Sequence, residues 1–260
     1  MDLSELLPSN SIESRRHPWE IARVRSLARI VHEQFVYIDS VLDIGCGDGF
    51  TGLELFKRFA ANRYVGYDRF LTVEQRDTWS SLERGIRFAQ ELPDPSHRSD
   101  LVLLCDVIEH VEDDVALLRD AWSRVAEGGL LVVTVPAFQS LFSSQDRALR
   151  HFRRYASSSL RRTFREAGIP PIRFGYLFGT LLLPRVLAVL YEGLRGQVSS
   201  ESAEFGIGAW QGSSRVTRLL GEALDIDNRL LLGLSRFGIR IPGLSAWVVV
   251  KKQTEQAQSV

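Results

Sequence analysis

The chain has 260 residues, of which 45% are hydrophobic and 25% are charged, and its formal net charge at pH 7 is zero. This length and composition are typical of one large folded domain and exclude a disordered or collagen-like chain. Without net positive charge the protein lacks the overall field that attracts nucleic acid, so no nucleic-acid partner is expected.

The first predicted element is a helix over residues 19–35, where apolar residues recur at the spacing of one helix face. It belongs to an expected N-terminal helical cap over residues 1–38. The N-terminus lacks the basic-then-apolar order of a signal peptide, and Cys46 and Cys105 form neither a disulfide framework nor a metal-ligand spacing. We therefore expect a cytoplasmic protein, and no metal is expected.

Residues 41–52 are typical of a buried strand that breaks into a glycine-rich turn and then opens a helix. Gly45, Gly47 and Gly49 stand at alternate positions, where they let the backbone approach a nucleotide-sized ligand. The helix that follows directs free N–H groups toward the same space. This turn is therefore the first predicted ligand site.

The charges beside this turn indicate which nucleotide it binds. The carboxylates of Asp43 and Asp48 disfavour the pyrophosphate of a dinucleotide such as NAD, and Phe50 stands where that fingerprint requires a third glycine. The same acidic rim suits the sulfonium and ammonium charges of S-adenosylmethionine.

A second predicted strand, over residues 64–68, ends in Asp68. A carboxylate at this strand end can accept hydrogen bonds from both hydroxyls of a ribose, which favours an adenosine ligand. The alternative is that Asp68 only caps the helix that follows, but the nearby glycine turn favours the ribose role.

Strands and helices alternate along the rest of the chain, which predicts a parallel sheet that binds ligands at the carboxyl ends of its strands. The expected core covers residues 39–173. A helical insertion over residues 174–243, with an apolar run broken by Pro184 and Arg185, precedes a final strand over residues 244–252. Residues 253–260 form a polar tail. The predicted strands cover residues 41–45, 64–68, 86–89, 101–105, 130–135 and 244–250, and the predicted helices cover residues 50–61, 72–82, 113–126, 157–167 and 216–237.

Three parts of the chain resemble the class I S-adenosylmethionine-dependent methyltransferases: residues 42–49, the strand-end Asp68, and residues 106–111. The resemblance implies an α/β, Rossmann-like, doubly wound and mostly parallel seven-stranded sheet, with S-adenosyl-L-methionine as the cofactor. Residues 17–23 and 146–155 resemble one bacterial branch of that superfamily, of the methyltransferase type 11/12 kind.

The resemblance, together with position along the chain, gives the residues expected to bind the cofactor. A carboxylate near the end of the third strand normally holds the adenine amino group in this family. The segment Phe88-Ala89-Gln90 has none, so Gln90 or backbone groups are expected to substitute. The expected cofactor-binding residues are Trp19, Arg23, Asp43, Gly45, Cys46, Gly47, Gly49, Asp68, Arg69, Gln90 and Asp106.

The acceptor is expected to lie against residues 146–155. A histidine there can take a proton from an acceptor hydroxyl, whereas an amine acceptor needs no base. Either histidine could instead be purely structural. Arginine is concentrated over residues 147–165, which suits an anionic acceptor. The expected catalytic residues are His151, His110 and Tyr155, and the expected acceptor-binding residues are Asp146, Arg153 and Arg154.

The sequence thus predicts methyl transfer to a nitrogen or oxygen of a small biosynthetic metabolite, such as a sugar intermediate. A membrane-associated glycan or lipid-linked acceptor is the alternative, because the arginines and the apolar insertion suit an anionic bilayer surface. A non-catalytic scaffold that binds S-adenosylmethionine is an alternative of another class. Peripheral membrane contact and a homodimer stay open.

Overall fold

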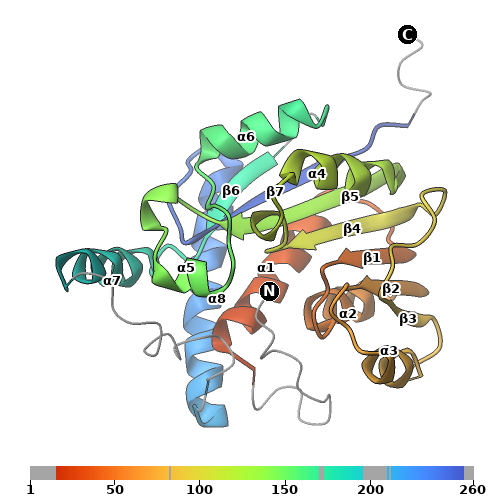
Figure 1. Ribbon diagram of the computed structural model, residues 1–260, viewed down its shortest axis with the longest axis horizontal. Coiled ribbons are helices and arrows are strands. Elements are labelled where there is room, and N and C mark those ends of the chain that lie inside the picture. The colour runs from red at the N-terminus through yellow and green to blue at the C-terminus, as the bar shows by residue number, and fades with distance from the viewer. Residues whose placement is uncertain (1–15, 82, 170–172, 196–209, 211, 255–260) are drawn as a thin grey trace.

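The computed structural model describes residues 16–81, 83–169, 173–195, 210 and 212–254. Within these residues, seven strands form one sheet in the order β3-β2-β1-β4-β5-β7-β6 (Figure 1). Neighbouring strands from β3 to β5 pair in parallel, and β7 runs antiparallel to β5 and to β6. The strands are β1 (Ser40–Ile44), β2 (Arg63–Tyr67), β3 (Ile86–Ala89), β4 (Ser99–Cys105), β5 (Val125–Pro136), β6 (Arg173–Leu177) and β7 (Ser245–Lys251).

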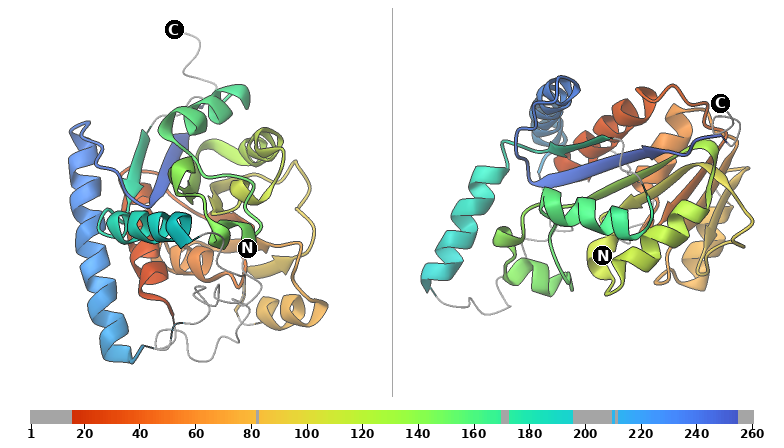
Figure 2. Two further views of the ribbon diagram at one scale, coloured as in Figure 1. Left: turned by 60° about the vertical axis from the view of Figure 1, so that its left-hand side comes forward. Right: turned by 90° about the horizontal axis from the view of Figure 1, so that it is seen from above.

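Helices cover both faces of this sheet (Figure 2). One face carries α1 (Pro18–His32), α2 (Phe50–Arg58) and α8 (Ser214–Arg236), and the other carries α4 (Asp114–Ser123) and α6 (Ser157–Glu166). The helix α3 (Val73–Ser80) packs against β3. The remaining described helices are α5 (Ser144–Ala148), α7 (Leu182–Arg195) and the short 3-10 turns η2 (Ile108–His110) and η3 (Gln139–Leu141).

The alternation of side chains along the central strand β4 divides the core between the two faces. Leu101 and Leu103 pack in the cluster that contains Leu27 of α1, whereas Leu104 packs with Leu118 of α4. Successive strand residues point to opposite faces, so an unbroken apolar run is what a strand buried on both faces requires. The predicted doubly wound sheet is confirmed.

The start of α1 is fixed by its own sequence. Pro18 stands in the first turn, where its missing N–H costs nothing, and His17 and Glu20 form a capping box. The His17 Nδ1 atom accepts from the Trp19 amide at 3.2 Å, and the His17 amide donates to the Glu20 carboxylate at 3.0 Å. This cap sets the position from which α1 directs side chains toward the strand ends.

Two expected elements need correction. β5 begins at Val125, at the end of the helix predicted over residues 113–126 and before the strand predicted over residues 130–135. The segment expected to begin a helical insertion instead starts with β6, the edge strand that completes the sheet. Gly175 lets β6 pack closely against β7 at this edge, because a Cβ there would lie 2.8 Å from the ring of Trp247 on β7. The helices α7 and α8 follow β6, and most of the segment between them lies outside the described residues.

None of the helices in the described ranges is both long enough and apolar enough to cross a membrane.

Candidate functional site

A cavity of about 340 Å³ opens at the carboxyl ends of β1 and β4, where the ligand of such a sheet is expected. One side of it, called here the cofactor wall, follows β1, and the opposite side, the acceptor wall, joins η2 to α7 and to the loop before α6. The cofactor wall consists of Asp43, Gly45, Cys46, Gly47 and Asp48, and the acceptor wall of Glu109, His110, His151, Arg154 and Arg185.

The glycine turn of the cofactor wall adopts a backbone that only glycine accepts without strain. Gly45 has φ +74° and Gly47 has φ +58°. A Cβ on Gly45 would lie 2.6 Å from a methyl group of Val107, so space as well as conformation excludes a side chain. The amides of Gly45 and Cys46 both donate to the Tyr67 carbonyl, at 2.8 and 3.0 Å, which ties the turn to the end of β2.

Two buried carboxylates lie at this turn. Burial raises the pKa of Asp43 to about 7, although Tyr64 donates a hydrogen bond to its carboxylate at 3.3 Å. Asp68 accepts from the Gly47 amide at 3.1 Å and from the Phe70 amide at 2.9 Å, while burial raises its pKa. Asp68 stands directly behind the turn and is not itself part of the cavity lining.

The helix α1 closes the cavity between the two walls with Trp19 and Arg23. The Arg23 guanidinium lies 4.2 Å from the ring centre of Trp19, donates to Thr51 at 3.1 Å, and forms an ion pair with Asp106. Asp106 has φ +56°, a strained conformation for a residue with a side chain. A strained backbone of this kind at a strand end is typical of a functional site.

Glu109 of the acceptor wall is fully buried, and neither of its carboxylate oxygens has a hydrogen-bond partner among the described residues. Burial raises the pKa of Glu109 well above its usual range, and the charge of Asp106 adds to the effect. An unpaired buried carboxylate is costly, so this group requires an explanation.

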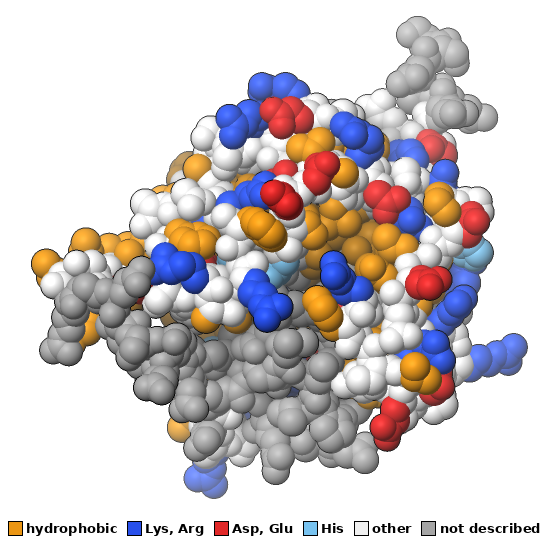
Figure 3. All heavy atoms as spheres, viewed as in Figure 1, with side chains coloured by type: hydrophobic (Ala, Val, Ile, Leu, Met, Phe, Trp, Pro, Cys, Tyr) orange, Lys and Arg blue, Asp and Glu red, His pale blue; other side chains and the backbone are white. Residues whose placement is uncertain are grey.

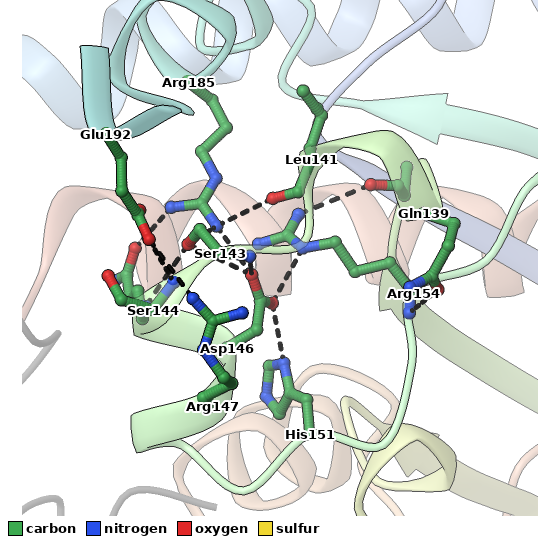
Figure 4. Close-up of polar contacts among 12 residues, drawn as sticks. Gln139, Leu141, Ser143, Ser144, Asp146, Arg147, His151, Arg154, Arg185 and Glu192 are labelled. Carbon is green, nitrogen blue, oxygen red and sulfur yellow. Dashed lines mark hydrogen bonds and ion pairs between the residues drawn. The ribbon is translucent and has the colours of Figure 1, made fainter. Parts of the chain in front are cut away.

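Asp146, in contrast, is fully buried and fully paired (Figure 4). One carboxylate oxygen accepts from His151 Nδ1 at 2.9 Å and Arg154 at 2.7 Å, and the other accepts from Arg185 at 2.7 Å and from the Ser143 amide at 2.9 Å. Burial alone would raise its pKa, but the hydrogen bond from His151 and the charge of Arg154 outweigh that effect and hold the pKa at about 2.

The two histidines of the acceptor wall lie together, with ring centres 4.5 Å apart. The hydrogen bond to Asp146 places the proton of His151 on Nδ1, which leaves Nε2 for the cavity. Burial lowers the pKa of His110 to about 3, so its ring is neutral, and the ring is hydrogen-bonded to the backbone of Leu149. Both rings are therefore held in place by hydrogen bonds to the segment 146–149.

Most of the residues expected at the site come together around the cavity. Those that line it directly are Trp19, Arg23, Asp43, Gly45, Cys46, Gly47, Asp106, His110, His151 and Arg154. Gly49 and Asp146 lie behind this lining, as Asp68 does. Gly49 has φ +79°, and a Cβ there would lie 2.6 Å from the Phe88 ring.

Four further expected site residues also lie outside the cavity lining. Tyr155 is buried and its hydroxyl donates to Asp114 at 2.7 Å, so it supports the fold from behind instead of orienting the acceptor. Arg153 donates to the Glu112 carbonyl at 2.8 Å and pairs with Asp114. The Gln90 amide donates to the Leu71 carbonyl, and the Arg69 guanidinium lies over the Phe70 ring.

Two residues of the acceptor wall were not among the expected site residues. Arg185 reaches Asp146 from α7, and the signal in the sequence was a lone cation inside an apolar run. Glu109 follows the end of β4, and no sequence pattern indicates that its buried carboxylate has no hydrogen-bond partner among the described residues.

Comparison with known proteins agrees with this geometry. A family profile described as a methyltransferase domain matches residues 13–170. The chain is 36% identical over 103 residues to the ubiquinone biosynthesis O-methyltransferase of Azorhizobium caulinodans, which covers 36% of this chain and 39% of that protein. It is 25% identical over 149 residues to the ajmaline N-methyltransferase of Rauvolfia serpentina, which covers 48% of this chain and 51% of that protein.

The fold is similar to that of an O-methyltransferase family protein from Burkholderia thailandensis, with a TM-score of 0.53 and 12% identity. That match covers 90% of this chain and 57% of the other. The chain spans about half the length, or less, of the curated relatives named above.

Proposed function

The chain belongs to the S-adenosylmethionine-dependent methyltransferases, and on that premise we propose that it methylates a nitrogen or oxygen of a small biosynthetic metabolite. The observation that carries this proposal is that two sides of one cavity carry different chemistry. One wall fits the methyl donor and the other presents polar groups to an acceptor. The relatives named above include both an O- and an N-methyltransferase, so they leave the acceptor atom open.

The cofactor wall fits S-adenosylmethionine. Gly45 and Gly47 have no side chains, have positive φ and line the cavity, so the backbone of the turn can approach a nucleotide closely. The carboxylates of Asp43 and Asp68 suit the positive charges and the ribose hydroxyls of this cofactor. The bound cofactor supplies a methyl group on a sulfonium, a strong electrophile that needs only an aligned lone pair.

The acceptor wall has the polar groups that an acceptor requires. Asp146 holds His151 in one orientation, so its Nε2 atom can accept the proton of an acceptor hydroxyl, as a general base does. Arg154 and Arg185 are held by the same carboxylate. An acceptor with a hydroxyl or amine beside a carbonyl or acid group would match this wall.

The test is transfer of a labelled methyl group from S-adenosylmethionine to a panel of amines, phenols and sugars. We expect one acceptor class to be labelled, and His151→Ala to lose activity while it still binds S-adenosylhomocysteine. Labelling of no acceptor by a protein that binds S-adenosylhomocysteine tightly would favour the non-catalytic scaffold instead.

A second candidate is a membrane-associated glycan or lipid-linked acceptor, and α7 favours it. This helix carries Arg185 into the cavity wall, and hydrophobic side chains gather on its outer surface (Figure 3). Flotation with anionic liposomes at low salt separates the candidates, because a protein that acts on lipid-linked acceptors should float with them. The exposed apolar residues on α7 are Leu183, Leu187, Leu190, Tyr191 and Leu194.

A further inference from the structure

Three side chains of the acceptor wall are placed as the ligands of a metal ion. Glu109, His110 and His151 each offer one ligand atom, and these atoms all lie within 4.8 Å of one another. All three side chains line the same cavity. A metal–ligand bond of about 2.1 Å places ligand atoms about 3 to 3.5 Å apart, so the three groups need to converge by roughly 1 to 2 Å.

The surroundings of both histidines match those of metal ligands. A histidine that binds a metal almost always donates its other ring N–H to a carboxylate or a backbone carbonyl. His151 is bonded through Nδ1 to Asp146 at 2.9 Å, and the ring of His110 is hydrogen-bonded to the backbone of Leu149. Each ring is therefore oriented by a partner outside the cluster, as the ring of a metal-binding histidine is.

Glu109 gives the independent observation. It is the one ligand of the three with a formal charge, it is fully buried, and both of its oxygens lack a hydrogen-bond partner among the described residues. The neighbouring cations are engaged elsewhere, since Arg23 pairs with Asp106 and Arg154 pairs with Asp146. A cation bound at the two histidines would supply the partner that this carboxylate lacks.

We propose that Glu109, His110 and His151 bind one divalent transition-metal ion, which in turn binds the acceptor through a hydroxyl oxygen. Two imidazoles and one carboxylate favour zinc, manganese, cobalt or iron over magnesium and calcium, which prefer oxygen ligands alone. Three protein ligands leave coordination positions open on the cavity side. The site was not expected from the sequence, because its ligands come from two separated segments.

The second half of this proposal rests on the proposed function and narrows it to a hydroxyl acceptor. A metal ion lowers the pKa of a bound hydroxyl group, and here the hydroxyl proton would leave to solvent. The oxygen lone pair then forms the bond to the methyl carbon, and the electrons of the broken carbon–sulfur bond return to sulfur. With an ion bound, His151 acts as a ligand, and no protein base is needed.

Metal binding is tested directly on the full chain, without any activity. Protein freed of metal by chelation and dialysis is titrated with Co²⁺ and with Zn²⁺ by calorimetry, and the Co²⁺ form is examined by visible absorption. We expect one ion per chain and cobalt bands in the visible region. Wild-type protein that binds neither ion stoichiometrically would overturn the proposal.

Variants locate the ion. Glu109→Gln keeps the shape of the side chain and adds no buried charge, so the variant should fold, and thermal unfolding checks this. We expect Glu109→Gln and His151→Ala each to weaken Co²⁺ binding by at least tenfold, whereas Glu112→Gln and His97→Ala, at exposed positions, bind like wild type. Equal binding by all four variants would place the ion elsewhere and contradict the proposal.

Titration of the same samples with S-adenosylhomocysteine separates this proposal from the proposed function. If S-adenosylhomocysteine binds and neither Co²⁺ nor Zn²⁺ does, the metal site is wrong and the methyltransferase assignment stands. If the ions bind at Glu109 and S-adenosylhomocysteine does not, the metal site stands and the proposed function is wrong. Labelling of hydroxyl acceptors only, and its loss on chelation, would support the role of the ion in the reaction.

Discussion

The cofactor wall and the acceptor wall face each other across one cavity, but the chain builds them in different ways. The cofactor wall is a single contiguous turn, Asp43 to Asp48, whose shape is set by backbone conformation and by hydrogen bonds to the end of β2. The acceptor wall is assembled around the side chain of Asp146, which binds His151 and Arg154 of the loop before α6 and Arg185 of α7. The cofactor wall, built from one short stretch of chain, therefore depends on glycine conformation. The acceptor wall, built from residues far apart in sequence, depends on one buried carboxylate.

The largest effect is expected from Asp146→Ala. This substitution leaves Arg154 and Arg185 without their anion, although their side chains are only 9% and 12% exposed. Loss of one partner from a buried ion-pair network typically costs about 3 to 5 kcal/mol of unfolding free energy. Chemical denaturation measures this loss of unfolding free energy, and Asp77→Ala, at an exposed position, is the control. Equal stability of the two variants would mean that Asp146 does not hold the acceptor wall together.

The cofactor wall is tested by Gly45→Ala. The positive φ costs roughly 1 to 2 kcal/mol, and the contact with Val107 adds about 1 to 3 kcal/mol. Gly128→Ala is the matched control, because Gly128 has a similar φ of +78° and nothing within 4 Å of the added Cβ. We expect Gly45→Ala to lose more unfolding free energy than Gly128→Ala and also to weaken S-adenosylhomocysteine binding. Equal losses of unfolding free energy in the two variants would show that the turn has room for a side chain at Gly45.

Tyr155→Phe tests whether Tyr155 supports the fold or belongs to the acceptor wall. The buried hydroxyl of Tyr155 donates to Asp114 at 2.7 Å and lies 3.2 Å from the Ile108 carbonyl, so its loss should lower the unfolding free energy by about 1 to 2 kcal/mol. Because Tyr155 does not line the cavity, the KM for the acceptor should stay unchanged. Tyr37→Phe, at an exposed position, is the control. A rise in the KM for the acceptor with an unchanged unfolding free energy would show that Tyr155 contributes to acceptor binding.

The smallest effect is a pH dependence of cofactor binding. Burial raises the pKa of Asp43 to about 7, so its carboxyl group is mostly neutral at pH 6 and mostly ionised at pH 8. Only the ionised form attracts the ammonium group of S-adenosylhomocysteine, so affinity should rise from pH 6 to pH 8, by at most about tenfold. Calorimetry at pH 6, 7 and 8 measures this rise. The same rise in Asp43→Asn would assign it to another group.

The two walls also differ in how far the sequence predicts them. The glycine turn, Asp43 and Asp68 could be recognised because strand, turn and helix follow one another within a short stretch of chain. The sheet could be predicted for the same reason, except at the edge. There, β6 has Gly175 at its centre and precedes an apolar helix, so it lacks a clear strand signal.

The acceptor wall could be predicted only in part, because its geometry depends on contacts between distant residues. Arg153 and Arg154 are neighbours in sequence, yet Arg154 faces the cavity and Arg153 pairs with Asp114 on the other side. Sequence places both in one loop but does not say which way each side chain points. Likewise, the hydrogen bonds of Asp146, and the absence of any to the Glu109 carboxylate from the residues that the structure describes, follow from packing across the fold.

The measurement that tests this division most directly is calorimetric titration with S-adenosylhomocysteine of wild type, Asp68→Ala and His151→Ala, each checked for folding by thermal unfolding. We expect wild type to bind, Asp68→Ala to bind at least about tenfold more weakly, since a carboxylate hydrogen bond contributes roughly 1.5 to 3 kcal/mol, and His151→Ala to bind like wild type. No binding by folded wild type, or an equal loss in both variants, would contradict a cavity divided between cofactor and acceptor.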